Sequence, residues 1–405
     1  MRRKPLFPPP VSAATGRRPR HKGRQEFSLL TVNGRIRICR VRWHVVGEGS
    51  QTPVDRLLDE AERSISEGVR ELSCRLNRGA TSFARTAENL ARAAHLVVGK
   101  ETVRQLVEGE GRAVLKAQQR GELSPDWTAR ECVAPEGPTR VYVGCDGVMV
   151  PLVTDAEKKK RRTAAKAKRQ RRGHRCRPLP PRKEGADQAY KEFKLGVLYD
   201  EDQERRFVGA TSGDHAVAGR MLQRMATQVG LAQAQEKIGL ADGSPWIRHE
   251  IEFHGLVDQL GLDYYHLREN VQKARLAVYG EESEVGRTWR EQVMGLFYEQ
   301  GYAAAWEYLV TWRGTLRGNK RAAADKLLGY IAERRETIRY PEFRRRGWQI
   351  GSGPTEAQCK AATQRLKGRG RRWDRTNAEA IMALDCLEQS HAWNLYWTTL
   401  DPSTN

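Results

Sequence analysis

Two stretches of the chain share a pattern that strongly limits its fold: an apolar run that meets an Asp-Gly step. They are VYVGCDGVMVP, residues 141–151, and KIGLADGSPWI, residues 237–247. β-Branched residues in such runs favour strands, and Asp-Gly is typical of turns. Each run therefore predicts a buried strand that presents one carboxylate, Asp146 or Asp242, at or near its end.

The segments between and after these runs predict a mixed α/β fold. Two further strand-like runs cover residues 192–200 and 205–212, and a helical period covers residues 216–230. The resulting order, β-β-β-α-β-α-β followed by helices, is typical of α/β proteins with a mixed sheet. In such sheets, sites form at the carboxyl ends of strands. We therefore expect the two Asp side chains to belong to one site.

The N-terminal third predicts a separate region. Residues 1–25 are rich in Pro and Arg and are expected to form a disordered basic arm. Residues 26–135 contain an Asn-Gly step between β-rich runs, which predicts a hairpin. A helix pair around Gly99 then resembles a helix-turn-helix. We interpret residues 26–135 as a DNA-binding region, with an ordinary αα-hairpin as the open alternative for the helix pair.

The rest of the chain divides into three parts. Residues 136–266 are expected to form the first part of a catalytic core, in which the basic run 157–187 is a flexible loop because it cannot bury a core. Residues 267–345 are expected to form an all-α insertion, and residues 346–405 the last helices of the core.

The charge balance favours a nucleic-acid or membrane-surface partner. The chain has 71 Lys and Arg against 50 Asp and Glu, a net charge of +21, and such an excess attracts polyanions. No apolar segment reaches the length of about 18 residues needed to span a membrane, and the seven scattered Cys favour reduced thiols. We expect a nucleic-acid partner and a cytoplasmic, nucleoid-associated protein.

Glu356, in GSGPTEAQCK, is the best third acid, at the start of an expected helix. Mg²⁺ takes a few carboxylates together with water and substrate phosphates, and a pair of such ions suits phosphodiester chemistry. Taken singly, Asp146 and Asp242 also suit turns, and Glu356 suits a helix N-terminus. Three acids in a strongly basic chain together predict a metal-dependent nucleic-acid enzyme.

Basic residues follow Glu356 at helical spacing and predict a face that contacts phosphates. Trp373 would either stack on a base or lie in the core. The expected DNA contacts are Lys158, Lys159, Lys160, Arg161, Arg162, Lys360, Lys367, Arg369, Arg371, Arg372 and Trp373.

Four motifs, in order, resemble those of the DDE transposases of ISKra-type insertion sequences, and more distantly the Mutator-like groups. They are CDGVMVP, LADGSPWI, DYYHLRE and GSGPTEAQCK with RLKGRGRRW, and they extend from about Val141 to the C-terminus. The resemblance implies an RNase H-like fold with Asp146 on the first strand, Asp242 after the fourth, and Glu356 on a late helix. An all-α insertion would separate Asp242 from Glu356.

The resemblance also implies an activity. Asp146, Asp242 and Glu356 would bind two Mg²⁺ (or Mn²⁺) ions, while Asp263 and His266 of DYYH would support the site rather than bind metal. The enzyme would cut double-stranded DNA at terminal inverted repeats and join the ends to target DNA, as a homodimer or higher assembly. A Cys-pair zinc ribbon, common in relatives, does not precede the core. Two alternatives remain: a structure-specific nuclease on the same core, and a non-catalytic DNA-binding protein derived from a transposase.

Overall fold

The structure is a computed structural model, and it describes residues 19–45, 49–52, 64–172 and 178–399. The chain forms two compact units. The first comprises residues 1–115 with 392–405, and the second comprises residues 116–391. We expected the boundary between the units at residue 135, but it falls earlier, after residue 115. The last residues, 392–405, group with the N-terminal unit and not with the core.

The first unit begins with a three-stranded antiparallel sheet, β1 (Arg20–Thr31), β2 (Gly34–Val45) and β3 (Gly49–Gln51). β1 and β2 pair from Thr31 and Gly34 outward, which is the hairpin that the Asn-Gly step indicated. Gly34 has a φ of +103°, a value that favours glycine. Residues 20–25, expected in the disordered arm, are part of β1; residues 1–18 lie outside the described residues.

The described residues of the first unit also form the helices α1 (Glu67–Gly79), α2 (Phe83–Ala94), most of α3 (Lys100–Arg120) and α14 (Trp393–Thr399). α2 and α3 are the helix pair expected around Gly99. The C-terminal helix is held in this unit partly by the Trp393 indole N–H, which donates to Glu71 at 2.7 Å.

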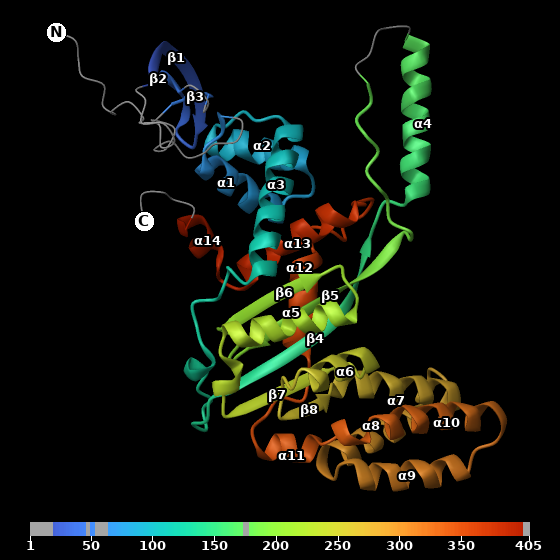
Figure 1. Ribbon diagram of the computed structural model, residues 1–405. Helices are drawn as coiled ribbons and strands as arrows, with labels where there is room; N and C mark the ends of the chain where they lie inside the picture. Colours follow the sequence, from blue (N-terminus) through green and yellow to red (C-terminus); the bar gives the residue numbers. More distant parts are fainter. Residues whose placement is uncertain (1–18, 46–48, 53–63, 173–177, 400–405) are drawn as a thin grey trace. The chain divides into compact units, whose positions relative to one another are not determined.

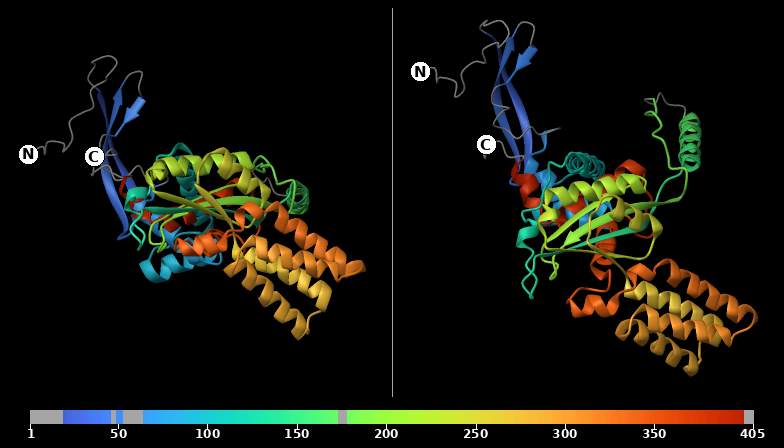
Figure 2. Two further views of the ribbon diagram at one scale, coloured as in Figure 1. Left: turned by 90° about the horizontal axis from the view of Figure 1, so that it is seen from below. Right: turned by 60° about the horizontal axis from the view of Figure 1, so that its bottom comes forward.

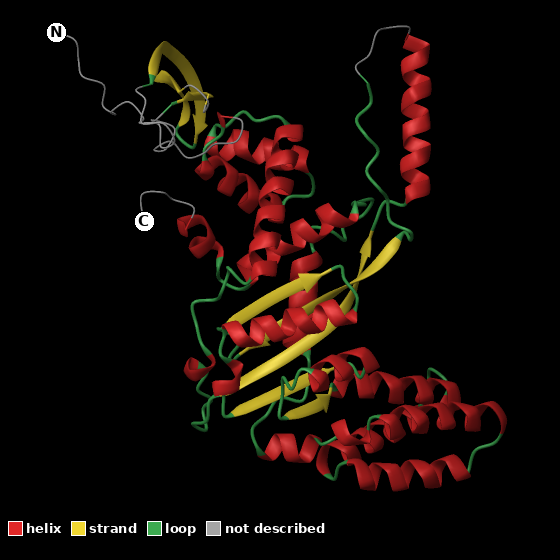
Figure 3. Ribbon diagram, in the orientation of Figure 1, coloured by secondary structure: helices red, strands yellow, loops and turns green. Residues whose placement is uncertain are grey.

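The second unit is a mixed α/β structure, which confirms the expected fold class at that level. Its sheet contains β4 (Arg140–Pro151), β5 (Tyr190–Tyr199), β6 (Arg206–Thr211), β7 (Glu236–Ala241) and β8 (Gln259–Leu262). The spatial order is β6-β5-β4-β7-β8 (Figures 1 and 3). β5 lies antiparallel to β4 and β6, whereas β7 lies parallel to β4 and β8.

Helices cover both faces of this sheet (Figure 2). α5 (His215–Gln228) and α6 (Pro245–Phe253) pack on one face, in a core with Val141, Val143 and Cys145 of β4. α12 (Gly353–Thr363) and α13 (Arg375–Gln389) contact β4 and β6, respectively. Because successive side chains of a strand point to opposite faces, Asp146 belongs to the face opposite Cys145, where α12 lies.

The segment between β8 and α12 is helical, as expected for the insertion. It contains α7 (Tyr264–Tyr279), α8 (Glu284–Glu299), α9 (Tyr302–Gly314), α10 (Gly318–Glu333) and α11 (Tyr340–Arg345). These helices bury a core of their own, which includes Trp289, Phe297 and Leu309. Nowhere in the described part of the chain is there a helix long and apolar enough to cross a membrane.

The basic run after β4 is a helix and not a flexible loop over much of its length. α4 spans Asp155–Arg172 and stands clear of the sheet (Figure 1). At its start, the Thr154 N–H donates to Glu157 at 3.1 Å, and the Glu157 N–H donates to the Thr154 hydroxyl at 3.3 Å. This reciprocal capping box stabilises a helix start, and Ala, Lys and Arg then favour helix without any burial.

Candidate active site

The three parallel strands bring three carboxylates to one edge of the sheet. Gly144 pairs with Leu240, and Ala241 pairs with Leu262. Continuing this register places Asp146 beside Asp242 and Asp242 beside Asp263. Asp146 is not at the end of its strand, because β4 continues to Pro151 against β5. It lies instead just beyond the point where the pairing of β4 with β7 ends, which is why the charge of Asp242 acts on Asp146.

Asp146 is a partly buried carboxylate close to a like charge. Burial raises its pKa above the usual range, and the neighbouring charge of Asp242 raises it further. Two hydrogen bonds oppose this rise, one from the Gly147 N–H at 2.6 Å and one from the Cys359 thiol. A cation at this position would relieve the repulsion between the two Asp residues.

Helix α12 packs closely against β4 at Gly144. A Cβ atom at Gly144 would lie 1.9 Å from the Thr355 hydroxyl and 3.0 Å from its Cβ, so only glycine admits the helix this closely. Glu356 and Cys359 follow on the same helix, and the Cys359 thiol reaches Asp146. The close packing therefore places Glu356 in the pocket that Asp146 lines, although ligand atoms of Asp146, Asp242 and Glu356 do not all lie within 4.8 Å of one another.

Asp146 and Glu356 line one pocket of about 700 Å³. His266 and Lys360 line it too, and Tyr265, whose side chain is 59% exposed, forms part of its wall. Asp242 is not among the residues that line this pocket, but its charge acts on Asp146 and His266.

Asp263 is fully buried and connects β8, α7 and the start of α12. It follows β8 directly and caps α7, since it accepts the His266 N–H at 2.7 Å. Its other oxygen accepts the N–H of Ser352, the residue before α12. Burial alone would raise the pKa of Asp263, but the hydrogen bonds from His266 and Ser352 outweigh it and leave the pKa below the usual range.

His266 lies between Asp263 and the pocket. Its Nδ1 is 3.2 Å from Asp263, and this hydrogen bond raises the pKa of His266 to about 9. Ligand atoms of Asp263, His266 and Glu356 all lie within 4.8 Å of one another, the one such group of three in the described ranges. Asp263 and His266, which we expected only to support the site, therefore offer ligand atoms beside Glu356.

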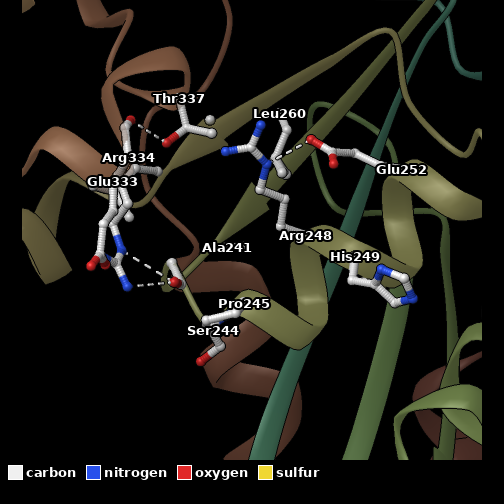
Figure 4. A pocket seen from close by; sticks show the side chains of 13 residues that line it. Ala241, Ser244, Pro245, Arg248, His249, Glu252, Leu260, Glu333, Arg334 and Thr337 are labelled. Carbon is white, nitrogen blue, oxygen red and sulfur yellow. Dashed lines mark hydrogen bonds and ion pairs between the residues drawn. The ribbon is translucent and has the colours of Figure 1, made fainter. Parts of the chain in front are cut away.

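Asp242 forms a tight turn of the kind that the Asp-Gly step also permitted. It accepts the Ser244 N–H at 2.7 Å and the Ser244 hydroxyl at 2.8 Å. Gly243 has a φ of +88°. Arg334, from the end of the helical insertion, donates twice to the Gly243 carbonyl at 2.9 and 3.1 Å (Figure 4). The insertion therefore fixes the turn that carries Asp242, beside a smaller pocket of about 340 Å³.

The structure separates the expected DNA-contacting residues into three groups. Lys360 and Lys367 line the pocket, and Arg369 is exposed in the turn after α12. Exposed cations on α4 include Lys159, Lys160 and Arg161. Lys158 and Arg162 instead donate to the carbonyls of Glu184 and Pro180, which hold the returning chain against α4.

The last group makes contacts within the protein, and the burial of Trp373 corrects the stacking role considered for it. Helix α12 ends at Thr363, so the later cations do not share its face. Arg371 donates to the Arg365 carbonyl at 2.8 Å, and Arg372 donates to the Leu152 carbonyl at 2.6 and 3.0 Å. Trp373 is 8% exposed and bonded to the Leu366 carbonyl. It belongs to the core and is not placed to stack on a base.

Sequence reasoning missed several residues of the site. Cys359, Tyr265 and Glu269 line the pocket. Cys359 follows Glu356 by three residues and Glu269 follows His266 by three, a spacing that puts each pair on one helix face. That spacing could have indicated them.

Comparisons with known proteins add no assignment: no family model matches the chain, and no curated protein matches it.

Proposed function

We propose that the chain is a DDE transposase with an RNase H-like core, which cuts DNA at the ends of an insertion sequence and joins them to a target. One observation carries the proposal: Asp146 and Asp242 lie side by side on parallel strands, and α12 brings Glu356 into the pocket that Asp146 lines. The first strand of the sheet carries Asp146, Asp242 directly follows the fourth, and a late helix carries Glu356, which supports the resemblance.

The residues present fit Mg²⁺ or Mn²⁺. Asp146, Asp242 and Glu356 offer hard carboxylate oxygens, the ligands that these ions prefer. Burial, and then the charge of Asp242, raises the pKa of Asp146, and a bound cation would favour the charged form of this carboxylate. Two bound ions would stabilise charge on the attacking and leaving oxygens of a phosphodiester.

Other residues of the chain would position these groups and the DNA. The Cys359 thiol orients Asp146, and Asp263 holds the start of α12 through Ser352. Lys360 and Lys367, at the pocket, would bind phosphates on either side of the cut. The N-terminal unit would recognise the terminal inverted repeats, and pairing of two ends would need a dimer or higher assembly.

The test is strand cleavage and joining with the DNA ends that flank the gene, with Mg²⁺ and then Mn²⁺. We expect wild type and Asp126→Asn, a control at an exposed Asp, to cut and join. Asp146→Asn and Asp242→Asn should bind DNA but lose the reaction by about 10²–10³-fold or more, the equivalent of several kcal/mol of transition-state stabilisation. Removal of metal with a chelator should stop wild type equally.

Two results would favour the alternatives. Cleavage without joined products would indicate a nuclease on the same core. DNA binding by every variant with no cleavage in either metal would indicate a DNA-binding protein, in which Asp242 serves only its turn.

A further inference from the structure

A second cluster of ligand-type side chains lies on the other face of the sheet, on α5 and α6. Its centre is Glu250, which is 3% exposed. The Nδ1 atom of His215 is 2.7 Å from Oε1 of Glu250, and the Nε2 atom of His249 is 3.9 Å from the same oxygen. Nε2 of His254 is 3.6 Å from Oε2. Three imidazoles thus surround one buried carboxylate.

The packing of α5 against α6 leaves room for this cluster. A Cβ atom at Gly219 of α5 would lie 1.9 Å from Oε2 of Glu250 and 2.8 Å from Nε2 of His254. Glycine inside a helix costs about 0.5–1 kcal/mol relative to alanine. The glycine leaves space for the Glu250 carboxylate and the His254 ring. A buried carboxylate in turn must be compensated by charge or hydrogen bonds.

We propose that His215, His249 and Glu250 form a binding site for a divalent transition-metal ion of the Zn²⁺ type, separate from the candidate active site. Imidazole nitrogens with one carboxylate suit Zn²⁺, Co²⁺ or Ni²⁺ and not Mg²⁺. Metal–ligand bonds of about 2.0–2.1 Å at tetrahedral angles place ligand atoms about 3.3 Å apart. The two N–O distances, 2.7 and 3.9 Å, lie on either side of that value.

The two outer ligands close onto the ion when it binds. Ligand atoms of the cluster do not all lie within 4.8 Å of one another, and the His215 and His249 rings are 6.2 Å apart at their centroids. Their side chains are 54% and 64% exposed, so both can rotate. Figure 4 shows His249 projecting from α6. A water would complete the tetrahedron.

His254 acts on the ion through Glu250. It is 9% exposed and next to the carboxylate oxygen that His215 and His249 leave free. At 3.6 Å the contact is a close approach and not a hydrogen bond, and it would orient the ligating carboxylate if the ring closes on Oε2. The bound ion would link α5 to α6, and α6 begins directly after the Asp242 turn. The site would therefore stabilise the segment that carries Asp242.

The test uses Co²⁺ as the probe, added to the full-length protein without a histidine tag. We expect the visible absorption of tetrahedral cobalt, displaced by Zn²⁺ and not by Mg²⁺. His215→Ala and His249→Ala should each weaken Co²⁺ binding at least about 10-fold, and His254→Gln about 10–100-fold. His391→Ala, at an exposed histidine of the same unit, should leave binding unchanged.

The active-site variant Asp242→Asn separates this site from the proposed catalytic one. Its Co²⁺ spectrum should equal that of wild type if the ion binds at Glu250. Two results would overturn the proposal: a wild-type protein without the tetrahedral spectrum, or Co²⁺ affinity unchanged in a folded His215→Ala/His249→Ala double variant, as judged by circular dichroism. Both leave the cleavage experiment untouched.

Discussion

Gly144 has the strongest steric control over the candidate site, although it binds nothing itself. It is the point of closest approach between β4 and α12, where any side chain would meet Thr355. Asp146 lies two residues after it, and Glu356 lies one residue after Thr355. The distance between the two acids therefore depends on a residue without a side chain.

Gly144→Ala should destabilise the protein by about 1–3 kcal/mol, the usual cost of overpacking a core, and should lower Mg²⁺-dependent cleavage more than DNA binding. The measurements are urea denaturation and the cleavage assay. Thr355→Ala in the same chain removes the hydroxyl of the 1.9 Å contact and should restore part of the stability.

Gly295→Ala is the matched control, because a Cβ there meets nothing within 4 Å and Gly295 is an exposed residue of α8. It should stabilise by about 0.5–1 kcal/mol. A Gly144→Ala protein as stable and active as wild type would contradict the close packing of α12.

His266 should titrate far from its usual range in the metal-free protein. Its hydrogen bond to Asp263 raises its pKa from 6.5 to about 9. A raised folded-state pKa stabilises the fold fully below pH 6.5, and this contribution is lost as the pH rises through about 9. NMR titration of the imidazole should show the high midpoint in wild type and a midpoint near the usual value in Asp263→Asn. An ordinary midpoint in wild type would show that the Asp263 pair does not form.

At the scale of elements, α4 is the clearest case of a helix without a core. Its residues are charged or small, and none of those whose side chains are described is buried. The proposed function gives such a helix a use that its composition suits, which is contact with phosphates along DNA. Its base is held by Arg372, which pairs with Glu157 and with the Leu152 carbonyl.

Lys159→Gln with Lys160→Gln should weaken DNA binding mainly at low salt. Each lost phosphate contact lowers the slope of log K against log salt concentration by about 0.9, so the double variant should lose up to about 1.8. Fluorescence anisotropy over a salt series measures this slope. Lys320→Gln with Lys326→Gln, two exposed lysines of α10, is the control of equal charge change. Equal slopes in wild type and the α4 variant would remove α4 from the DNA interface.

At the scale of the whole molecule, the division into two units predicts separable functions. Residues 116–391 contain the complete sheet, the acids and the helical insertion. We expect this fragment to fold and to cut DNA with Mg²⁺ but to lose preference for terminal repeats, which the first unit would recognise. Competition between repeat and random DNA measures the preference. A fragment that folds and keeps full preference would place recognition in the core.

Local sequence was enough to indicate most strands and most helices. Strand runs and Asp-Gly steps are local signals, since propensity and turn chemistry act over a few residues. The hairpin at Gly34 and the helix that begins at Gly353 follow from the same kind of signal. The helix α4 was missed because its charge suggested disorder, although the Thr154–Glu157 capping box was present in the sequence.

The sequence by itself determined which residue types the site could use, because apolar runs must be buried and a carboxylate within or directly after such a run needs a polar or charged partner. Only the tertiary structure decided which of them meet. Sheet register aligned Asp146, Asp242 and Asp263, and the glycine contact at Gly144 brought up α12. Trp373 is buried in the core, and His266 lies close to Glu356. These outcomes depend on pairing and packing between residues far apart in the chain, for which no local pattern exists.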